Sequence, residues 1–565
     1  MQPTNPIDLS FSLLWPNGKK DDIVLLREET ALDLDLDKLV QFFTIDPKNQ
    51  ASLSHTFLSL CRNPATISAR LDIIDDLLAF PKLNDCIDDI LPVIYELRYY
   101  AEHLRRTDLT ELQEVVWRLR ELENYLVVVV KLAEGFAPCR EKLCSAGLRS
   151  LADLVTGIKS GEDYRRLADE LPELLGKVNN IKSVTIGVNL NSGMIPAEAT
   201  LVSINDTRYT YGPAYSSLFG KEKTAGIAPL HKVPETPEFI NPLAVPLFKD
   251  IYGIMKKILR PISEKLKEFV NISSGLFVKL VEDFLFFRGA VKMISVLKKS
   301  GLMMCRPRLL DSKERRCNIS GLYNINLAIF LMGGRSDNIE SLEGTIIPNN
   351  IDLDDTGRIA ILTGPNRGGK TTFLQALGLA HIMLQTGLYI PADSAEMSLV
   401  DSVYTHYPVR ENLEKGTGRF GEEAQRIAVI FNEATQSSLL LFNETLSSTS
   451  AGESLYLAED IVRVCRTMGV RLVFATHLHQ LAGNVDVING DIPGGSRVFS
   501  LVARIEKVSR DPTPDSELET IRPTFRIIPA PPEGQSYAIE LASKYGISRK
   551  QLLEKLADRN IVSGP

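Results

Sequence analysis

One short segment, GPNRGGKT at residues 364–371, most restricts the folds open to this chain. It fits the pattern G-x-x-x-x-G-K-[ST] without a mismatch. An apolar run, RIAILTG at 358–364, comes before it, and a helical pattern from Thr372 to His381 comes after it. A buried strand that passes through such a loop into a helix is typical of a parallel sheet covered by helices on both faces. The segment therefore predicts an α/β domain in the C-terminal half.

The residue types in this loop indicate phosphate binding. Glycines let several backbone N–H groups face one anion, and the N-terminus of the following helix adds a favourable dipole. Lys370 would place a positive charge on the β- and γ-phosphates, and the Thr371 hydroxyl would bind Mg²⁺. A plain glycine turn is the alternative, but strand, motif and helix occur in the required order. We therefore predict an ATP and Mg²⁺ site formed by Gly364, Pro365, Asn366, Arg367, Gly368, Gly369, Lys370, Thr371 and Thr372.

A second apolar run, SLLLFNE at 438–444, ends in Asn443 and Glu444. In P-loop proteins this position normally carries Asp-Glu, where the Asp holds Mg²⁺ through water and the Glu orients or activates the attacking water. Asn443 keeps an acceptor oxygen but loses the charge, so we expect weaker Mg²⁺ binding. Glu444 is the predicted catalytic residue. The alternative is a strand that simply ends in polar residues.

A third apolar run, VRLVFATH at 470–477, ends at His477. A histidine at the end of this strand is suitably placed to sense the γ-phosphate, and we predict that role for His477. A structural histidine is the alternative. Because helical segments separate the three runs, they predict a parallel sheet that is buried on both faces.

These residues, in this order, resemble the MutS family. The segment TGPNRGGKTTFLQ (363–375) is similar to the MutS P-loop, whose Pro-Asn and Gly-Gly-Lys are distinctive. The resemblance covers most of 340–550, and upstream the segment 34–78 is more weakly similar to the start of the MutS core domain. The other matching segments are PNNIDLDDTGRIAIL (348–362), QTGLYIPADSAEMSLVDSVYTHYP (385–408), LLLFNE (439–444), STSAGESLYLA (448–458), FATHLHQLA (474–482) and GQSYAIELASKYGIS (534–548).

The resemblance and the periodicities predict a multidomain chain: a mainly α core and lever region with a small β-containing insertion, followed by an α/β P-loop ATPase domain of the ABC type. The predicted parts are an N-terminal segment with short strands (1–33), a helical core and first lever (34–180), a clamp-like β and loop insertion (181–247), returning lever helices (248–317), and a MutS-like ATPase domain with a C-terminal helical dimerisation segment (318–565).

The chain also departs from the family pattern. MutS reads mismatches with a Phe-x-Glu wedge near its N-terminus, whereas here Phe-x-Glu occurs only at 420–422, 431–433 and 442–444. Too little sequence precedes residue 34 to hold that domain, and no Smr-like segment follows residue 555. We therefore expect no mismatch recognition by that route.

The resemblance further implies a homodimer with composite ATP sites. In the family a signature segment reaches the partner's nucleotide, and here it corresponds to LEKGTGRFGEEAQRI (413–427). Gly418 stands where MutS has a Ser. Each site would combine Lys370, Thr371, Glu444 and His477 of one subunit with the 416–423 loop of the other, so Gly418 is a predicted nucleotide contact.

The charge distribution leaves room for nucleic acid. The net charge is −7, yet residues 249–316 contain sixteen Lys or Arg against seven Asp or Glu. Such a stripe would bind phosphates without sequence preference and in a salt-dependent manner, although solvated helix faces explain it equally well. The loop YTYGPAY (209–215) offers aromatics that stack on bases, but a packed loop is the favoured interpretation.

The composition places the protein among cytoplasmic proteins. Seven cysteines lack any C-x-x-C pair, as expected of reduced thiols. The N-terminus shows no secretory signal, and the apolar runs are too short to span a membrane. We expect no membrane partner.

Two functional hypotheses follow. The first is a MutS-like ATPase that binds and hydrolyses ATP to control a dimeric clamp on branched or structured DNA. The second is a nucleotide-gated scaffold on structured RNA or ribosomes with slow or vestigial hydrolysis, which the neutral Asn443 supports. A transporter ATPase fits poorly, because such subunits rarely carry so much lever-like helix before the P-loop.

Overall fold

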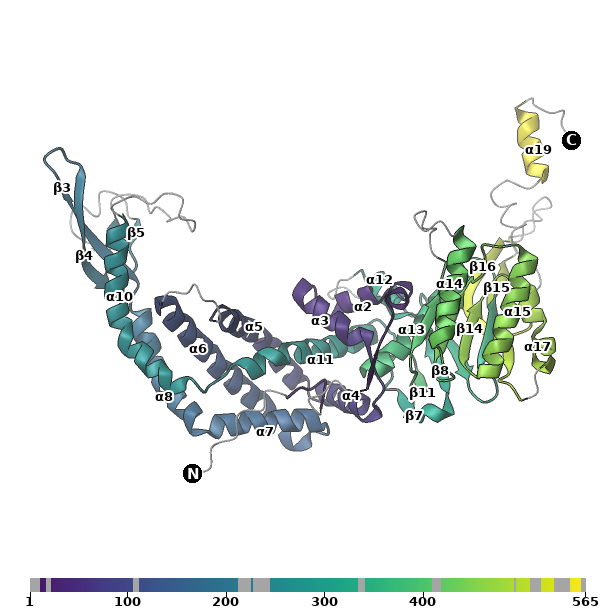
Figure 1. Ribbon diagram of the computed structural model, residues 1–565, viewed down its shortest axis with the longest axis horizontal. Helices are drawn as coiled ribbons and strands as arrows, with labels where there is room; N and C mark the ends of the chain where they lie inside the picture. The colour runs from purple at the N-terminus through teal and green to yellow at the C-terminus, as the bar shows by residue number, and fades with distance from the viewer. Residues whose placement is uncertain are drawn as a thin grey trace. The chain divides into compact units, whose positions relative to one another are not determined.

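The computed structural model divides the chain into two compact units (Figure 1). The helical unit comprises Met1–Leu13 and Ala79–Phe284, and the sheet unit comprises Leu14–Leu78 and Leu285–Pro565. The structure describes residues 11–16, 22–104, 111–211, 225–226, 244–333, 341–408, 418–491, 494–508, 520–532 and 549–559.

Long amphipathic helices build the helical unit. Its central helix, α6 (Glu111–Phe136), contacts α5, α7, α8 and α10. In α6, Val115, Leu119 and Leu122 are buried at the three- and four-residue spacing of one helix face. Arg118 donates hydrogen bonds to the carbonyls of Phe269 and Ile272, at 2.9 and 2.8 Å. The other elements are α5 (Pro81–His103), η1 (Arg140–Lys142), α7 (Ala146–Ser160), α8 (Glu162–Asn179), α10 (Ala244–Leu266), η2 (Lys267–Phe269) and the first part of α11 (Gly275–Lys299).

A β-hairpin extends from the helical unit beside α10 (Figure 1). Its strands, β3 (Ser183–Leu190) and β4 (Pro196–Asn205), pair antiparallel from Ser183 opposite Asn205 to Leu190 opposite Pro196. Two shorter strands, β5 (Thr210–Tyr211) and β6 (Ala225–Gly226), pair in parallel. Most of the predicted loop-rich part of this insertion lies outside the described residues.

A six-stranded sheet forms the centre of the sheet unit. Its strand order is β12-β13-β14-β10-β15-β16; the first five strands are parallel and β16 runs antiparallel. Every residue of β10, β13 and β14 is buried, which explains their continuous apolar sequence. The strands are β10 (Ile359–Thr363), β12 (Val403–His406), β13 (Leu439–Asn443), β14 (Arg471–Ala475), β15 (Val498–Val508) and β16 (Thr520–Pro529).

Helices cover both faces of this sheet. Leu440 and Phe442 of β13 share a hydrophobic core with residues of α14 and α15. Leu441 between them points to the opposite face, against Gly378 of α13. The helices of the sheet and the last described helix are α13 (Lys370–Thr386), α14 (Gly418–Glu433), α15 (Ala451–Met468), α16 (His479–Gly483), α17 (Val485–Asp491) and α19 (Arg549–Asp558).

A second, four-stranded mixed sheet adjoins the first, with strand order β7-β11-β8-β9. Arg471 is fully buried where β14 begins and connects the two sheets. Its guanidinium donates to the carbonyls of Arg316, Ser398, Leu399 and Ser437, at 2.9–3.3 Å. The elements here are β7 (Arg308–Leu310), η3 (Ser312–Glu314), β8 (Cys317–Leu322), α12 (Ile325–Leu331), β9 (Asn349–Leu353) and β11 (Ser394–Ser398).

The N-terminal segment from Leu14 to Leu78 packs in the sheet unit. Leu34 is fully buried against Gly378 of α13, and Gln375 donates a 2.9 Å hydrogen bond to the Asp33 carbonyl. The structure therefore divides the predicted helical part 34–180 at residue 79. The segment contains β1 (Ile23–Leu25), α1 (Glu28–Asp33), α2 (Leu36–Phe43), α3 (Pro47–Leu58), β2 (Ser59–Cys61) and α4 (Pro64–Ala79).

Within the described parts of the chain, every helix falls short of the length and hydropathy that a bilayer crossing requires.

Candidate nucleotide site

Three segments singled out in the sequence leave the large sheet at the same edge. Ala475 of β14 lies opposite both Leu362 of β10 and Asn443 of β13. Just beyond the strands, the Glu444 amide donates to the Ala475 carbonyl at 2.8 Å, and the Thr476 amide donates to the Leu362 carbonyl at 2.9 Å. The carboxyl edge of a parallel sheet is where α/β proteins bind ligands. The structure thus brings the glycine-rich loop, Glu444 and His477 together.

The backbone of the loop requires glycine at its two ends. Gly364 has φ +139°, and a Cβ there would lie 2.7 Å from the Cβ of Ala503. Gly369, at the start of α13, has φ +91°, and Arg367 also adopts a left-handed conformation with φ +61°. Such left-handed turns direct successive N–H groups inward and form an anion-binding concavity. The loop therefore has the conformation of an anion cradle, and a side chain at residue 364 would collide with Ala503 of β15.

Lys370 crosses the mouth of this cradle. Its side chain is almost completely buried, and Nζ donates to the carbonyls of Gly364 and Pro365, at 2.9 and 3.1 Å. An ammonium group has three N–H donors, so one remains for a phosphate oxygen. Burial lowers the pKa of Lys370 to about 8, and the nearby Glu444 carboxylate partly opposes that shift. A bound anion would restore the charge that burial disfavours.

Glu444 and His477 form a pair beside the lysine. The His477 Nε2 lies 2.8 Å from the Glu444 Oε1, and both side chains remain partly exposed. The hydrogen bond from His477 is the main cause that lowers the pKa of Glu444, and the charges of His477 and Lys370 add to it. Glu444 itself has φ +50°, a left-handed conformation that is strained for this residue type and is typical of functional sites. The carboxylate is ionised at neutral pH and reachable by water.

Two oxygen-bearing side chains lie where Mg²⁺ is expected. The Thr371 hydroxyl donates to the Asn443 Oδ1 at 3.3 Å. Mg²⁺ is usually bound by one or two carboxylates together with water and phosphate oxygens, so two neutral oxygens would hold it more weakly. Among the described residues, no cluster of three or more His, Cys, Asp or Glu is arranged to hold a metal. These residues fit a weakly held ion that depends on nucleotide phosphates for its other ligands.

Gly418 is not brought to this cradle within one chain. It begins α14 with φ +67°, and α14 packs against β12, which lies three strands away from β10. The preceding residues 413–417 of the signature segment lie outside the described residues, as does the predicted dimerisation segment 534–548. The role of Gly418 in a partner's site stays a prediction.

One aromatic neighbour of the loop was not predicted. Phe525 of β16 is 46% exposed with φ +58°, and a Cβ at Gly369 would lie 3.5 Å from its ring. Asn349 fixes the strand there, because its Nδ2 donates to the Phe525 carbonyl at 3.1 Å and its Oδ1 accepts from the Ile527 amide at 2.6 Å. No motif marks Phe525, because its position depends on how β16 pairs with β15.

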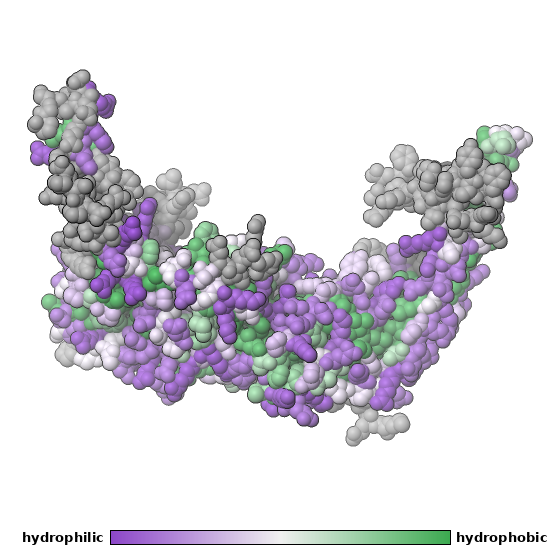
Figure 2. Space-filling model, turned by 180° about the vertical axis from the view of Figure 1, so that it is seen from behind, coloured by the Kyte–Doolittle hydropathy of each residue, from purple (hydrophilic) through white to green (hydrophobic). Residues whose placement is uncertain are grey.

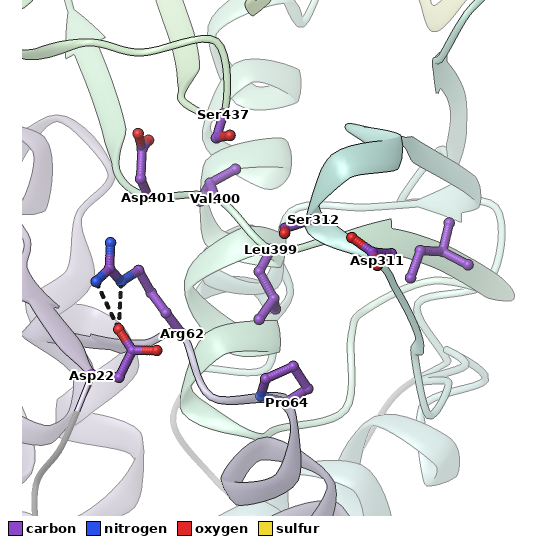
Figure 3. Close-up of a pocket in the computed structure, with 10 residues that line it drawn as sticks. Asp22, Arg62, Pro64, Asp311, Ser312, Leu399, Val400, Asp401 and Ser437 are labelled. Carbon is purple, nitrogen blue, oxygen red and sulfur yellow. Dashed lines mark hydrogen bonds and ion pairs between the residues drawn. The ribbon is translucent and has the colours of Figure 1, made fainter.

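A cavity of about 430 Å³ lies elsewhere in the sheet unit (Figure 3). Arg62 there pairs with Asp22, and Asp401 accepts hydrogen bonds from Ser438 and from the Ser402 amide, both at 2.7 Å. Asp401 precedes β12, so the cavity lies at the amino edge of the parallel strands. Because its charges already have partners and the loop lies at the other edge, the cavity is not part of the site.

The basic stripe is partly neutralised within the protein. Arg260 pairs with Glu264, Lys265 with Glu170 and Glu268, and Arg306 with Asp72 and Asp75. Of the predicted stacking residues, Tyr209 has its hydroxyl 2.9 Å from the Thr185 hydroxyl, as the packed interpretation requires. Tyr215 lies outside the described residues.

Taken together, this geometry defines a multidomain protein in which a mostly parallel sheet carries a glycine-rich anion cradle and a carboxylate at its carboxyl edge. The family model for MutS domain V matches residues 360–491, and that for the MutS2 N-terminal domain matches residues 62–300. The chain is MutS-like in both units, and the resemblance predicted from the sequence is confirmed.

Curated relatives agree with these matches. The DNA mismatch repair protein MutS of Lawsonia intracellularis is 24% identical over 97% of this chain and 62% of its own length. That of Syntrophomonas wolfei is 24% identical over 76% of this chain and 50% of its own. That of Chlorobium chlorochromatii is 33% identical over 33% of this chain and 22% of its own. The chain thus spans less than two thirds of each of these relatives.

Proposed function

We propose that this protein binds ATP with Mg²⁺ at the 364–371 loop and hydrolyses it, and that the nucleotide controls how a MutS-like dimer holds DNA. The observation that carries the proposal is the placement of Lys370 and the Glu444–His477 pair at the same sheet edge as the cradle. A cation that binds the phosphates beside an ionised carboxylate that can orient water is suited to phosphoryl transfer to water.

Each group has a defined part in this proposal. The loop amides and the third N–H of Lys370 bind the phosphates, and Phe525 offers an aromatic surface beside the loop. Thr371 and Asn443 hold the metal, which supplies charge neutralisation on the phosphates. Glu444, fixed by His477, orients a water molecule and accepts its proton, while Lys370 stabilises the charge that develops on the phosphate.

The DNA part of the proposal comes from the relatives, whose names describe DNA mismatch repair proteins. The family resemblance adds a homodimer in which the 416–423 loop, with Gly418, completes the partner's ATP site. We further propose branched or structured DNA as the target, and the binding experiment below compares it with a linear duplex. Apart from the neutral Asn443, no described feature favours the RNA scaffold, so structured RNA serves as a comparison in the DNA-binding experiment.

The hydrolytic part is tested with Glu444→Gln. The amide keeps the shape of the side chain but cannot accept a proton, so we expect ATP binding within about threefold of the parent and turnover reduced at least about 100-fold. Lys370→Ala is the matched control and should abolish binding of labelled ATP. Equal turnover in Glu444→Gln would remove Glu444 from the mechanism, and undiminished binding in Lys370→Ala would refute the site.

The DNA part is tested separately by fluorescence anisotropy. A four-way junction, a linear duplex and a structured RNA of equal length are compared with and without ATP. We expect the junction to bind most tightly and ATP to change its affinity. If the protein prefers the RNA, RNA rather than DNA is its target. If all three ligands bind equally, the proposed preference for branched DNA is wrong.

A further inference from the structure

The β3–β4 hairpin has a composition unlike the rest of the chain. Residues 183–205 include a single charged side chain, Glu198, and no Lys or Arg. Most surface strands of soluble proteins alternate apolar with charged or polar residues. A hairpin without cations has nothing with which to neutralise phosphates, so it is unsuited to a purely electrostatic grip on a nucleic-acid backbone.

Large apolar side chains are instead exposed toward the end of this hairpin. Val188 and Leu190 on β3 are about half exposed, whereas Met194 and Ile195 in the connecting turn are 76% and 62% exposed. Figure 2 shows the end of the hairpin, at the upper right, coloured largely as hydrophobic. Single exposed apolar residues are ordinary, but a group of them at one projecting tip indicates an interaction site.

Hydrogen bonds of Asn191 hold the turn that carries this tip. The Asn191 side-chain oxygen accepts from the amides of Gly193 and Ile195 at 2.9 and 3.1 Å. The backbone of Asn191 also bonds both Ile195 and Met194 at 3.0 Å. Met194 has φ +60°, a conformation that Gly or Asn would adopt at less cost. Turn geometry alone therefore does not account for a methionine at the most exposed position.

Positive charge lies on the helix beside the hairpin stem. β4 packs against α10, on which Lys256 and Lys257 are exposed and Arg260 is exposed beside Glu264. A hairpin with an apolar tip and a cationic helix beside its stem is complementary to a ligand with an apolar stacked interior and an anionic exterior. Duplex DNA has that construction. Met, Ile and Pro are among the side chains that proteins insert between base pairs from the minor groove.

We propose that the hairpin tip, formed by Met194 and Ile195, is an apolar wedge that inserts into a base step of DNA while α10 contacts the phosphates. The proposal rests on the proposed DNA-binding function and adds to it a specific contact. Insertion unstacks the step and kinks the duplex, and pyrimidine–purine steps such as TA yield most easily.

The experiment uses the full chain and duplex and junction DNAs with 2-aminopurine at TA steps, whose fluorescence rises when the base unstacks. We expect saturating protein to raise the fluorescence at least about twofold, as partial unstacking by a wedge requires.

The double variant Met194→Ala, Ile195→Ala should lose the rise and bind DNA several-fold more weakly, with an unchanged slope of affinity against salt. Val202→Ala, an equally exposed apolar truncation on the hairpin stem, is the matched control and should keep the rise. Thermal unfolding checks that both variants are folded.

The outcomes separate the wedge from the function beneath it. Tight DNA binding by the parent without a fluorescence rise, or an equal rise with the double variant, overturns the wedge and leaves the DNA clamp standing. Failure of the parent to bind any DNA overturns both. A double variant that binds DNA normally but shifts from dimer to monomer in sedimentation shows that the tip contacts a second copy of the chain, which also overturns the wedge.

Discussion

At the scale of single residues, the site is a set of charges that balance one another without a ligand. Lys370 is buried between two carbonyls, and its nearest countercharge is the Glu444 carboxylate, which His477 also holds. The charge of each group therefore shifts the pKa of the other. We expect the protonation of both groups to change when nucleotide binds.

The lowered pKa of Lys370, about 8, makes nucleotide binding depend on pH. Phosphates bind the charged ammonium and raise its pKa, so binding takes up a proton when the empty site is partly neutral. The affinity for ATP should be constant below about pH 7.5 and fall up to about tenfold per pH unit above pH 8. Fluorescent-nucleotide titrations between pH 6.5 and 9.5 measure this.

Lys370→Arg is the control for that prediction, because a guanidinium stays charged throughout this range. Its affinity is expected to be lower but nearly independent of pH. A parent protein whose affinity does not change between pH 7 and 9.5 would show that the lysine is fully charged in the empty site.

Asn443 makes a second prediction at this scale. An Asp at this position would add a negative charge 3.3 Å from the Thr371 hydroxyl, where the metal is proposed to bind. Asn443→Asp should therefore lower the Mg²⁺ concentration for half-maximal ATP turnover by about tenfold, which corresponds to about 1.4 kcal/mol. Asn443→Ala should raise it. Identical Mg²⁺ dependence in all three proteins would place the metal elsewhere.

At the scale of elements, the sequence predicted the strands of the site because their signal is local. β10, β13 and β14 are mainly apolar runs, and the glycine-rich loop, Glu444 and His477 follow within two residues of their ends. Phe525 was not predicted, since its position depends on a bulged antiparallel pairing of β16 with β15 across many residues. The place of Leu34 was missed for a similar reason: an amphipathic helix pattern does not say which distant surface it covers.

The contact of Leu34 with α13 can be tested by overpacking. A Cβ at Gly378 would lie 2.8 Å from both Leu34 methyl groups and 2.9 Å from Leu441, so Gly378→Ala should destabilise the sheet unit by about 1–3 kcal/mol. In the same unit, a Cβ at Gly452 of α15 meets nothing within 4 Å, and Gly452→Ala should change stability by less than about 0.5 kcal/mol. Calorimetric unfolding of the two variants compares them, and equal stability would mean that α13 and Leu34 are not in close contact.

At the scale of the whole molecule, charge counts overestimate the nucleic-acid surface. Sixteen free cations in 249–316 would give a slope of log affinity against log salt of about −14. Several of them pair with acids of the chain itself, such as Arg260 with Glu264 and Lys265 with Glu268. We therefore expect a slope clearly shallower than about −14, measured by anisotropy on duplex DNA between 50 and 300 mM salt. A slope near −14 would mean that DNA displaces these internal partners.

The sheet unit is built from two segments that lie far apart in the sequence, Leu14–Leu78 and Leu285–Pro565. The first segment is therefore synthesised well before the second. Residues 14–78 pack with residues that follow 285, so the nascent helices around Leu34 must wait for α13. At typical translation rates of 5–20 residues per second, a gap of about 300 residues lasts roughly 15–60 seconds. During that interval the apolar face around Leu34 lacks the surface of α13 that covers it in the folded sheet unit.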